Sequence, residues 1–95
     1  MKNIKVAIIE DDHEIRHLLS IIIDKTDGYM CKQLYPDCES AIPEIMQYVP
    51  DIVLMDIDLP LMNGIEGVIH LRNKGFENPI LMLTIHADSD HVFDS

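Results

Sequence analysis

Basic residues are scarce in this sequence. Seven lysines and arginines stand against seventeen aspartates and glutamates, so the formal net charge is -10 at pH 7. A field of that sign repels phosphate backbones and anionic membrane surfaces. We therefore expect no direct binding of nucleic acid by this chain. The scarcity is most complete after Lys74, because no lysine or arginine follows it.

Long hydrophobic runs are also missing. The start of the chain holds one short apolar run, residues 6–9, whereas a signal peptide needs an apolar region of about 7–15 residues. No later run approaches the roughly 20 apolar residues of a membrane-spanning helix. The sequence therefore predicts a cytoplasmic protein that makes no contact with a membrane.

Cysteine is rare, with only Cys31 and Cys38 in the chain. Cytoplasmic proteins keep their thiols reduced, so we interpret both cysteines as packing residues and not as a disulfide. Among the five histidines, His13 and His17 form the only pair at helical spacing, and no cysteine lies near them in the sequence. An exposed helical face explains this pair better than a zinc site.

The chain of 95 residues is long enough for one small domain, and 47% of its residues are hydrophobic. Within it, apolar runs alternate with segments of helical spacing. Buried strands are expected at residues 5–9, 29–35, 52–55 and 79–84. Helices are expected from Glu14 to the Asp27-Gly28 pair, from about Asp37 to about Tyr48 with Pro43 near the start, from about 65 to 74, and at 88–95. This alternation predicts an α/β fold with a doubly wound parallel sheet.

Acidic residues lie where two of these strands end. Glu10 and Asp11 follow the first strand, and Asp56 follows the third. If those strands are neighbours, three carboxylates converge at one edge of the sheet, and they repel one another unless a cation or protons neutralise them. Oxygen ligands of this kind suit Mg²⁺. The alternative is that the acids are solvated residues at strand ends.

Asp56 is the candidate nucleophile of this cluster. A carboxylate next to Mg²⁺ is able to attack a phosphoryl group and form an aspartyl phosphate, whose charge the metal shields. Asp56 directly follows an apolar strand and precedes a loop that contains Pro60 and Gly64.

Several short motifs of this sequence together resemble those of a known protein family. They are Ile8-Ile9-Glu10-Asp11-Asp12, Arg16, the run from Asp51 to Pro60, Asn63-Gly64, and Leu81-Met82-Leu83-Thr84. In this order and spacing they resemble the receiver domain of two-component response regulators, along essentially all 95 residues. The resemblance implies a flavodoxin-like sheet with strand order 2-1-3-4-5, a sensor histidine kinase as partner, and a signalling role that is not enzymatic.

The resemblance also implies roles for individual residues. Asp56 is the expected phosphoacceptor. Asp11 is expected to bind Mg²⁺ directly, with Glu10 assisting and the main-chain carbonyl of Asp58 as a further ligand. The hydroxyl of Thr84 is expected to bond a phosphoryl oxygen after transfer.

The sequence also departs from the family pattern. Receiver domains have a fifth strand that ends in a lysine, followed by a fifth helix, and neither is present before the sequence stops inside the expected fourth helix. Ile85 stands where the family usually has a small residue. We therefore expect impaired switching, and a homodimer in which strand 80–84 pairs with its mate or the last helix, with Val92 and Phe93, is exchanged.

Two other functions stay open at this point. Asp56-Ile57-Asp58 also matches the nucleophile and the acid/base pair of phosphohydrolases of the haloacid dehalogenase type, although those enzymes usually carry the motif on their first strand. The second alternative is an interaction module that keeps a docking surface and does not switch.

Overall fold

The computed structural model describes residues 3–84 of the chain. Its elements are β1 (Ile4–Ile9), α1 (His13–Asp24), β2 (Tyr29–Tyr35), α2 (Cys38–Gln47), β3 (Ile52–Asp56), α3 (Gly64–Asn73) and β4 (Ile80–Leu83). The order agrees with the expected alternation. The expectations for Ile85, for a helix at 88–95 and for Val92 and Phe93 fall outside the described residues. No helix within residues 3–84 has the length and apolar character to cross a membrane.

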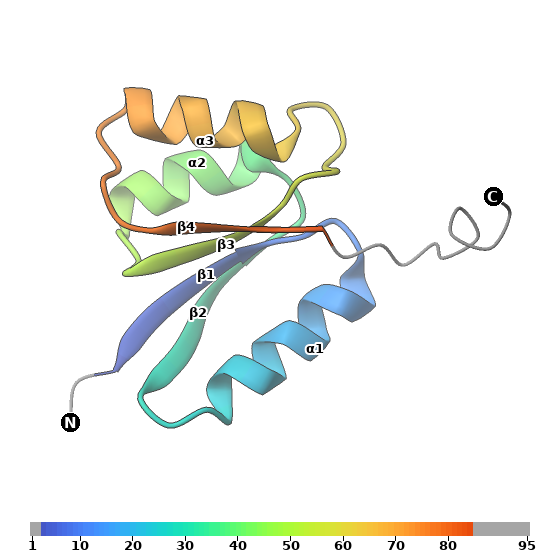
Figure 1. Cartoon of the computed structure of the whole chain (residues 1–95), viewed down its shortest axis with the longest axis vertical. Helices are drawn as coiled ribbons and strands as arrows, with labels where there is room; N and C mark the ends of the chain where they lie inside the picture. Colours follow the sequence, from blue (N-terminus) through green and yellow to red (C-terminus); the bar gives the residue numbers. More distant parts are fainter. Residues whose placement is uncertain (1–2, 85–95) are drawn as a thin grey trace, which may run out of the picture.

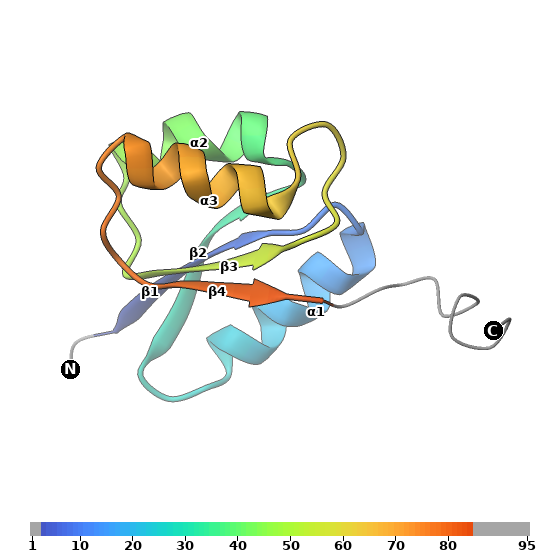
Figure 2. The same cartoon turned by 45° about the horizontal axis from the view of Figure 1, so that its top comes forward.

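The four strands form one parallel sheet in the order β2-β1-β3-β4. Helix α1 lies on one face of the sheet, and α2 and α3 lie together on the other (Figure 1). The turned view shows α2 and α3 side by side, with β4 at the edge of the sheet (Figure 2). The predicted doubly wound parallel sheet is therefore confirmed.

Alternate residues of the central strands fill the two layers of the core. Ala7 and Ile9 of β1 pack on the side of α2 and α3, whereas Val6 and Ile8 pack on the side of α1. This alternation follows from the period of two in a β-strand. Cys38, the first residue of α2, is buried, Cys31 on β2 is half-buried, and neither forms a disulfide, as the sequence predicts.

Side-chain caps set the starts of the helices. Asp12 accepts a hydrogen bond from the main-chain N–H of Ile15 (3.0 Å) at α1, and Asp37 accepts one from Ser40 (2.7 Å) at α2. Each cap satisfies an amide that has no partner inside the helix. One expectation is corrected here: Pro43 is the sixth residue of α2 and does not lie near its start. The helix continues through the proline because Ile42, before it, and Ile45, two residues after it, are buried in the core.

Strand β2 contains a bulge that the sequence does not reveal. Val6 of β1 pairs with Cys31, but the next residue, Ala7, pairs with Gln33. Lys32 is therefore the extra residue of a β-bulge, a feature common at sheet edges. Next to it, the main-chain N–H of Cys31 donates to Oδ1 of Asp24 in α1 at 2.7 Å.

Candidate functional site

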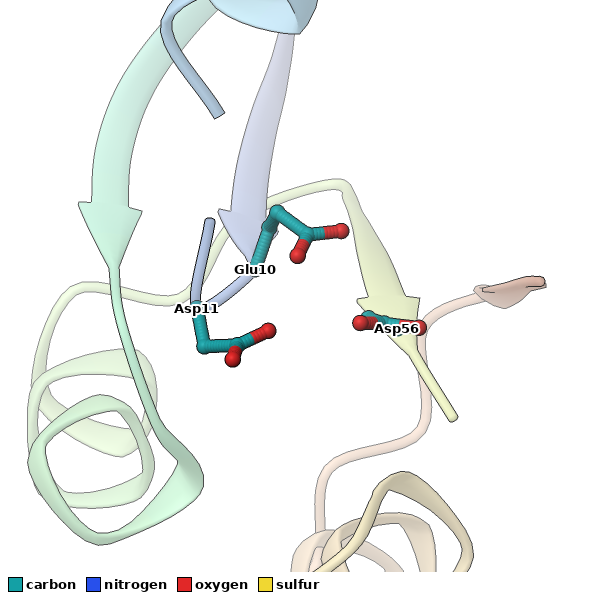
Figure 3. A group of neighbouring side chains, drawn as sticks. All are labelled: Glu10, Asp11 and Asp56. Atoms are coloured by element: carbon teal, nitrogen blue, oxygen red, sulfur yellow. The ribbon is translucent and has the colours of Figure 1, made fainter. Parts of the chain in front are cut away.

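The pairing of β1 with β3 brings the predicted acids together. Ile9 pairs with Met55, so the next residues, Glu10 and Asp56, leave the two strands side by side. Carboxylate oxygens of Glu10, Asp11 and Asp56 all lie within 4.8 Å of one another. Figure 3 shows the three side chains pointing toward a common point at the carboxyl ends of the strands.

The three carboxyl groups differ in burial. Glu10 is 1% exposed and Asp56 is 2% exposed, while Asp11 lies at the surface. Oε2 of Glu10 accepts a hydrogen bond from the main-chain N–H of Asp12 (3.1 Å). Its other oxygen, Oε1, is buried with no hydrogen-bond partner among residues 3–84. Solvent therefore reaches the site at Asp11, and the buried Oε1 of Glu10 is an acceptor without a hydrogen bond from any described residue.

Burial makes ionisation of this site unfavourable. Burial, and then the negative charge of Asp56, raise the pKa of Glu10 from 4.5 to about 7. Burial likewise raises the pKa of Asp56, although the N–H of Asp58, which donates to Oδ1 of Asp56 at 3.2 Å, acts in the opposite direction. Two buried carboxyl groups in contact are stable only when protons or a cation neutralise them.

The residues present fit a divalent cation. All the candidate ligands are carboxylate oxygens, which Mg²⁺ prefers, and Mg²⁺ needs only a few protein oxygens because it keeps several waters. The unpartnered Oε1 of Glu10 is an acceptor that a cation or its water would satisfy. The donor set therefore agrees with the magnesium site predicted from the sequence.

Arg16 and the two spaced histidines take no part in this cluster. The Nη1 group of Arg16 donates to the main-chain oxygen of Glu10 (2.7 Å), and its Nη2 group meets Nδ1 of His13 at 3.1 Å. The rings of His13 and His17 stack with centroids 6.4 Å apart on the exposed side of α1. Arg16 thus fixes the end of β1, and the cluster consists of carboxylates.

The loop between β3 and α3 is anchored on both sides. The N–H of Gly64 donates to the oxygen of Ile57 (2.9 Å), and the N–H of Met62 donates to Oε2 of Glu39 in α2 (3.0 Å). Leu61, directly before Met62, adopts a positive φ of 61°. Sequence reasoning missed Glu39 because it lies 23 residues before Met62.

The other two predicted site residues lie beside the cluster. Asp58 is exposed and contributes the main-chain N–H that bonds Asp56. Thr84 is exposed and directly follows β4, whose residue Leu83 pairs with Asp56. Thr84 therefore lies one position beyond the pairing partner of Asp56, at the same edge of the sheet.

Comparison with known proteins identifies similar sequences along almost the whole chain. The family model described as the response regulator receiver domain matches residues 6–95. The transcriptional regulatory protein DegU of Brevibacillus brevis is 30% identical over 89 residues, which are 94% of this chain and 38% of that protein. A protein-glutamate methylesterase/protein-glutamine glutaminase of Treponema denticola is 29% identical over 84 residues, 88% of this chain and 23% of that protein. The chain thus spans less than two fifths of these curated relatives.

Solved structures give the same match at the level of the fold. A LuxR-family two-component response regulator from Aurantimonas superposes with a TM-score of 0.83 at 27% identity, covering 97% of this chain and 66% of that one. The response regulator domain of CheB from Thermotoga maritima gives a TM-score of 0.81 at 26% identity, covering 96% of this chain and 69% of that one. The flavodoxin-like arrangement expected from the sequence is therefore confirmed.

Proposed function

The chain belongs to the family of response regulator receiver domains, and on that premise we propose that Asp56 accepts a phosphoryl group from a sensor histidine kinase. The observation that carries the proposal is the position of Asp56. It ends β3, is 2% exposed, and lies against Glu10 and Asp11. A nucleophilic carboxylate in such a setting fits the aspartyl phosphate chemistry of covalent phosphoryl transfer.

The transfer has a simple balance of bonds. A carboxylate oxygen of Asp56 attacks phosphorus, and the bond between phosphorus and the ring nitrogen of the donor histidine breaks. The ring nitrogen keeps the electron pair of that bond and takes up a proton. Mg²⁺ would be held by the carboxylates of Glu10, Asp11 and Asp56 and by the main-chain carbonyl of Asp58. Its positive charge would offset the negative charge of the phosphoryl oxygens.

Thr84 has the second role in this proposal. Its hydroxyl group donates to an oxygen of the phosphoryl group once Asp56 carries it. The register of β3 and β4 supports the assignment, because Leu83 pairs with Asp56 and Thr84 follows. A hydroxyl group is able to donate such a bond without adding charge.

Further parts of the proposal concern the whole chain. We assign all 95 residues to one receiver domain that works in the cytoplasm as a signalling module and not as an enzyme. Family membership supports these assignments and the histidine kinase partner. The phosphohydrolase alternative loses its support, because Asp56 ends the third strand of a receiver domain and Asp58 follows it in the loop. A docking module that does not switch remains the second candidate.

Acetyl phosphate tests the phosphoacceptor. Incubation of the chain with acetyl phosphate and Mg²⁺ is expected to add the mass of one phosphoryl group to a fraction of the molecules, as measured by intact mass spectrometry. We expect well under one phosphoryl group per chain, because this chain has no lysine after Lys74 to stabilise the charge that develops during transfer.

Two variants separate the possible acceptors. Asp56→Asn is expected to abolish the added mass, whereas Asp58→Asn, which keeps its main-chain groups, retains it. Absence of any labelling of the wild-type chain, or labelling that survives in Asp56→Asn, contradicts the proposed acceptor. Stoichiometric labelling contradicts only the proposed need for a lysine.

A further inference from the structure

A second recess lies away from the acidic cluster. It is a cleft of about 600 Å³ between β2 and the carboxyl-terminal end of α2, and it includes Lys5 of β1. Its volume falls in the range of sites for small molecules, about 300–1,000 Å³. None of the three acids of the candidate metal site lines it. The cleft therefore requires an explanation of its own.

Two tyrosines, Tyr35 and Tyr48, line this cleft. The oxygen of Tyr35 accepts a hydrogen bond from Nε2 of Gln33 (2.8 Å), and the oxygen of Tyr48 accepts one from Nε2 of Gln47 (3.3 Å). Each phenol keeps its own hydrogen for a further partner. A tyrosine hydroxyl group is protonated at neutral pH, and burial raises the pKa of Tyr35 further.

Two ammonium groups add to these donors. Lys5 and Lys32 both line the cleft, and neither side chain has a hydrogen bond or ion pair within residues 3–84. They are two of only seven basic residues in a chain of net charge -10. Lys32 is the bulged residue of β2, and a bulge redirects a side chain relative to the regular strand. Glu44 is the only acid in the lining.

The remaining wall is apolar and open to solvent. Leu34 is 44% exposed, Val49 is 53% exposed and Tyr48 is 59% exposed, and all three line the cleft. Contact with a flat apolar group would remove this surface from water, which is favourable in proportion to the area covered. The cleft thus combines an excess of hydrogen-bond donors and positive charge with one hydrophobic side.

We propose that this cleft binds a small anion that carries a flat apolar group, such as an aryl phosphate or an aryl carboxylate. The anionic head lies between Lys5 and Lys32 and accepts the hydrogen of the Tyr35 hydroxyl group. The flat group covers Tyr48 and Val49. Charge-assisted hydrogen bonds orient the head, and apolar contact supplies the preference for an aryl compound over a bare anion.

Amide chemical shifts of the isotope-labelled chain test this proposal, with phenyl phosphate and benzoate as probes and Mg²⁺ left out. Either probe is expected to shift the amides of residues 32–35 and 48–49 with a dissociation constant of about 1 mM. Inorganic phosphate binds there more weakly because it lacks the aryl group. The tighter of the two probes identifies the preferred head group.

Charge variants provide the matched control. Lys32→Gln is expected to weaken binding of the tighter probe by about fivefold, whereas Lys25→Gln, at the end of α1 and outside the cleft, leaves it unchanged. Dispersed amide signals establish that each variant is folded. The proposal is overturned if neither probe shifts these residues at about 10 mM, if inorganic phosphate binds as tightly as phenyl phosphate, or if Lys32→Gln binds like the wild type.

Discussion

Gly64 lies so close to Asp56 that a β carbon on Gly64 would overlap the main-chain oxygen of Asp56. The same β carbon would also lie 2.8 Å from the α carbon of Ile57. Both atoms belong to the backbone and have little freedom to move. The first residue of α3 is therefore pressed against the end of β3, and the absence of a side chain there sets how the proposed phosphoacceptor is presented.

Replacement of this glycine tests the contact. Gly64→Ala is expected to lower the free energy of unfolding by about 2 kcal/mol, because the added methyl group overpacks a rigid site, and to shift the amide signals of residues 56–58. In Gly28→Ala no atom lies within 4 Å of the new methyl group, and the positive φ alone costs about 1 kcal/mol. Urea denaturation and amide spectra measure both effects. Unchanged signals at 56–58 in Gly64→Ala would show that the end of β3 accommodates a side chain.

Stability without metal should depend on pH through Glu10. The folded state raises the pKa of Glu10 from 4.5 to about 7, so between these values the folded chain binds a proton that the unfolded chain has lost. The free energy of unfolding therefore falls as pH rises from about 4.5 to about 7, and the loss is complete above that range. The raised pKa of Asp56 acts in the same direction.

Denaturation midpoints at pH about 5 and about 8 measure this slope. Glu10→Gln, which does not titrate, is expected to flatten it. A wild-type chain that becomes more stable across this interval would contradict the assigned direction.

Mg²⁺ should bind weakly at the acidic cluster. Titration to about 10 mM is expected to shift the amides of residues 10–12 and 56–58, because the carboxylate ligands converge. Binding stays weak because the raised pKa of Glu10 lets protons compete with the cation. Asp11→Asn removes the exposed ligand and weakens binding. Asp27→Asn, an exposed acid of the turn that follows α1, serves as the control. If Mg²⁺ shifts amides across the acidic surface but not those of residues 10–12 and 56–58, the cation only screens charge and binds no specific site.

The chain is expected to form a homodimer through β4. Within residues 3–84 this strand is an edge of the sheet, and Leu81 on it is 53% exposed. An apolar edge is a template for pairing with another strand, and burial of about 200 Å² of apolar surface contributes about 5 kcal/mol before the entropy of association is subtracted.

Sedimentation at about 100 μM tests this association. Leu81→Lys should yield monomers, because a charge on the edge opposes pairing. Leu61→Lys changes a leucine that is 87% exposed in the loop after β3 and should leave the dimer intact. A wild-type monomer of 10.9 kDa would refute the expected dimer.

The sequence predicted the features that depend on near neighbours or on strand ends. The strand predicted at residues 29–35 has the bounds of β2, and α1 begins one residue before the predicted Glu14. The convergence of Glu10 with Asp56 was also predictable, because parallel strands that are neighbours end at the same edge.

Features that depend on contacts between distant segments were not predictable. The bulge at Lys32 exists because β2 shifts its register against β1, and nothing in the local pattern reveals that shift. Pro43 was placed too near the start of α2, because local preference disfavours an interior proline while burial of the surrounding helix outweighs that cost. The cleft between β2 and α2 was likewise not predictable, because its two tyrosines come from different elements.

The bond between Asp24 and the N–H of Cys31 has a consequence for how copies of this chain assemble. Together with the bulge at Lys32, it interrupts the β2 edge of the sheet, whereas no such feature interrupts the β4 edge within the described residues. A molecule with one unpaired edge strand stops associating once that strand is paired, because the dimer has no second free edge. Concentrated solutions should therefore accumulate closed pairs and not fibrils.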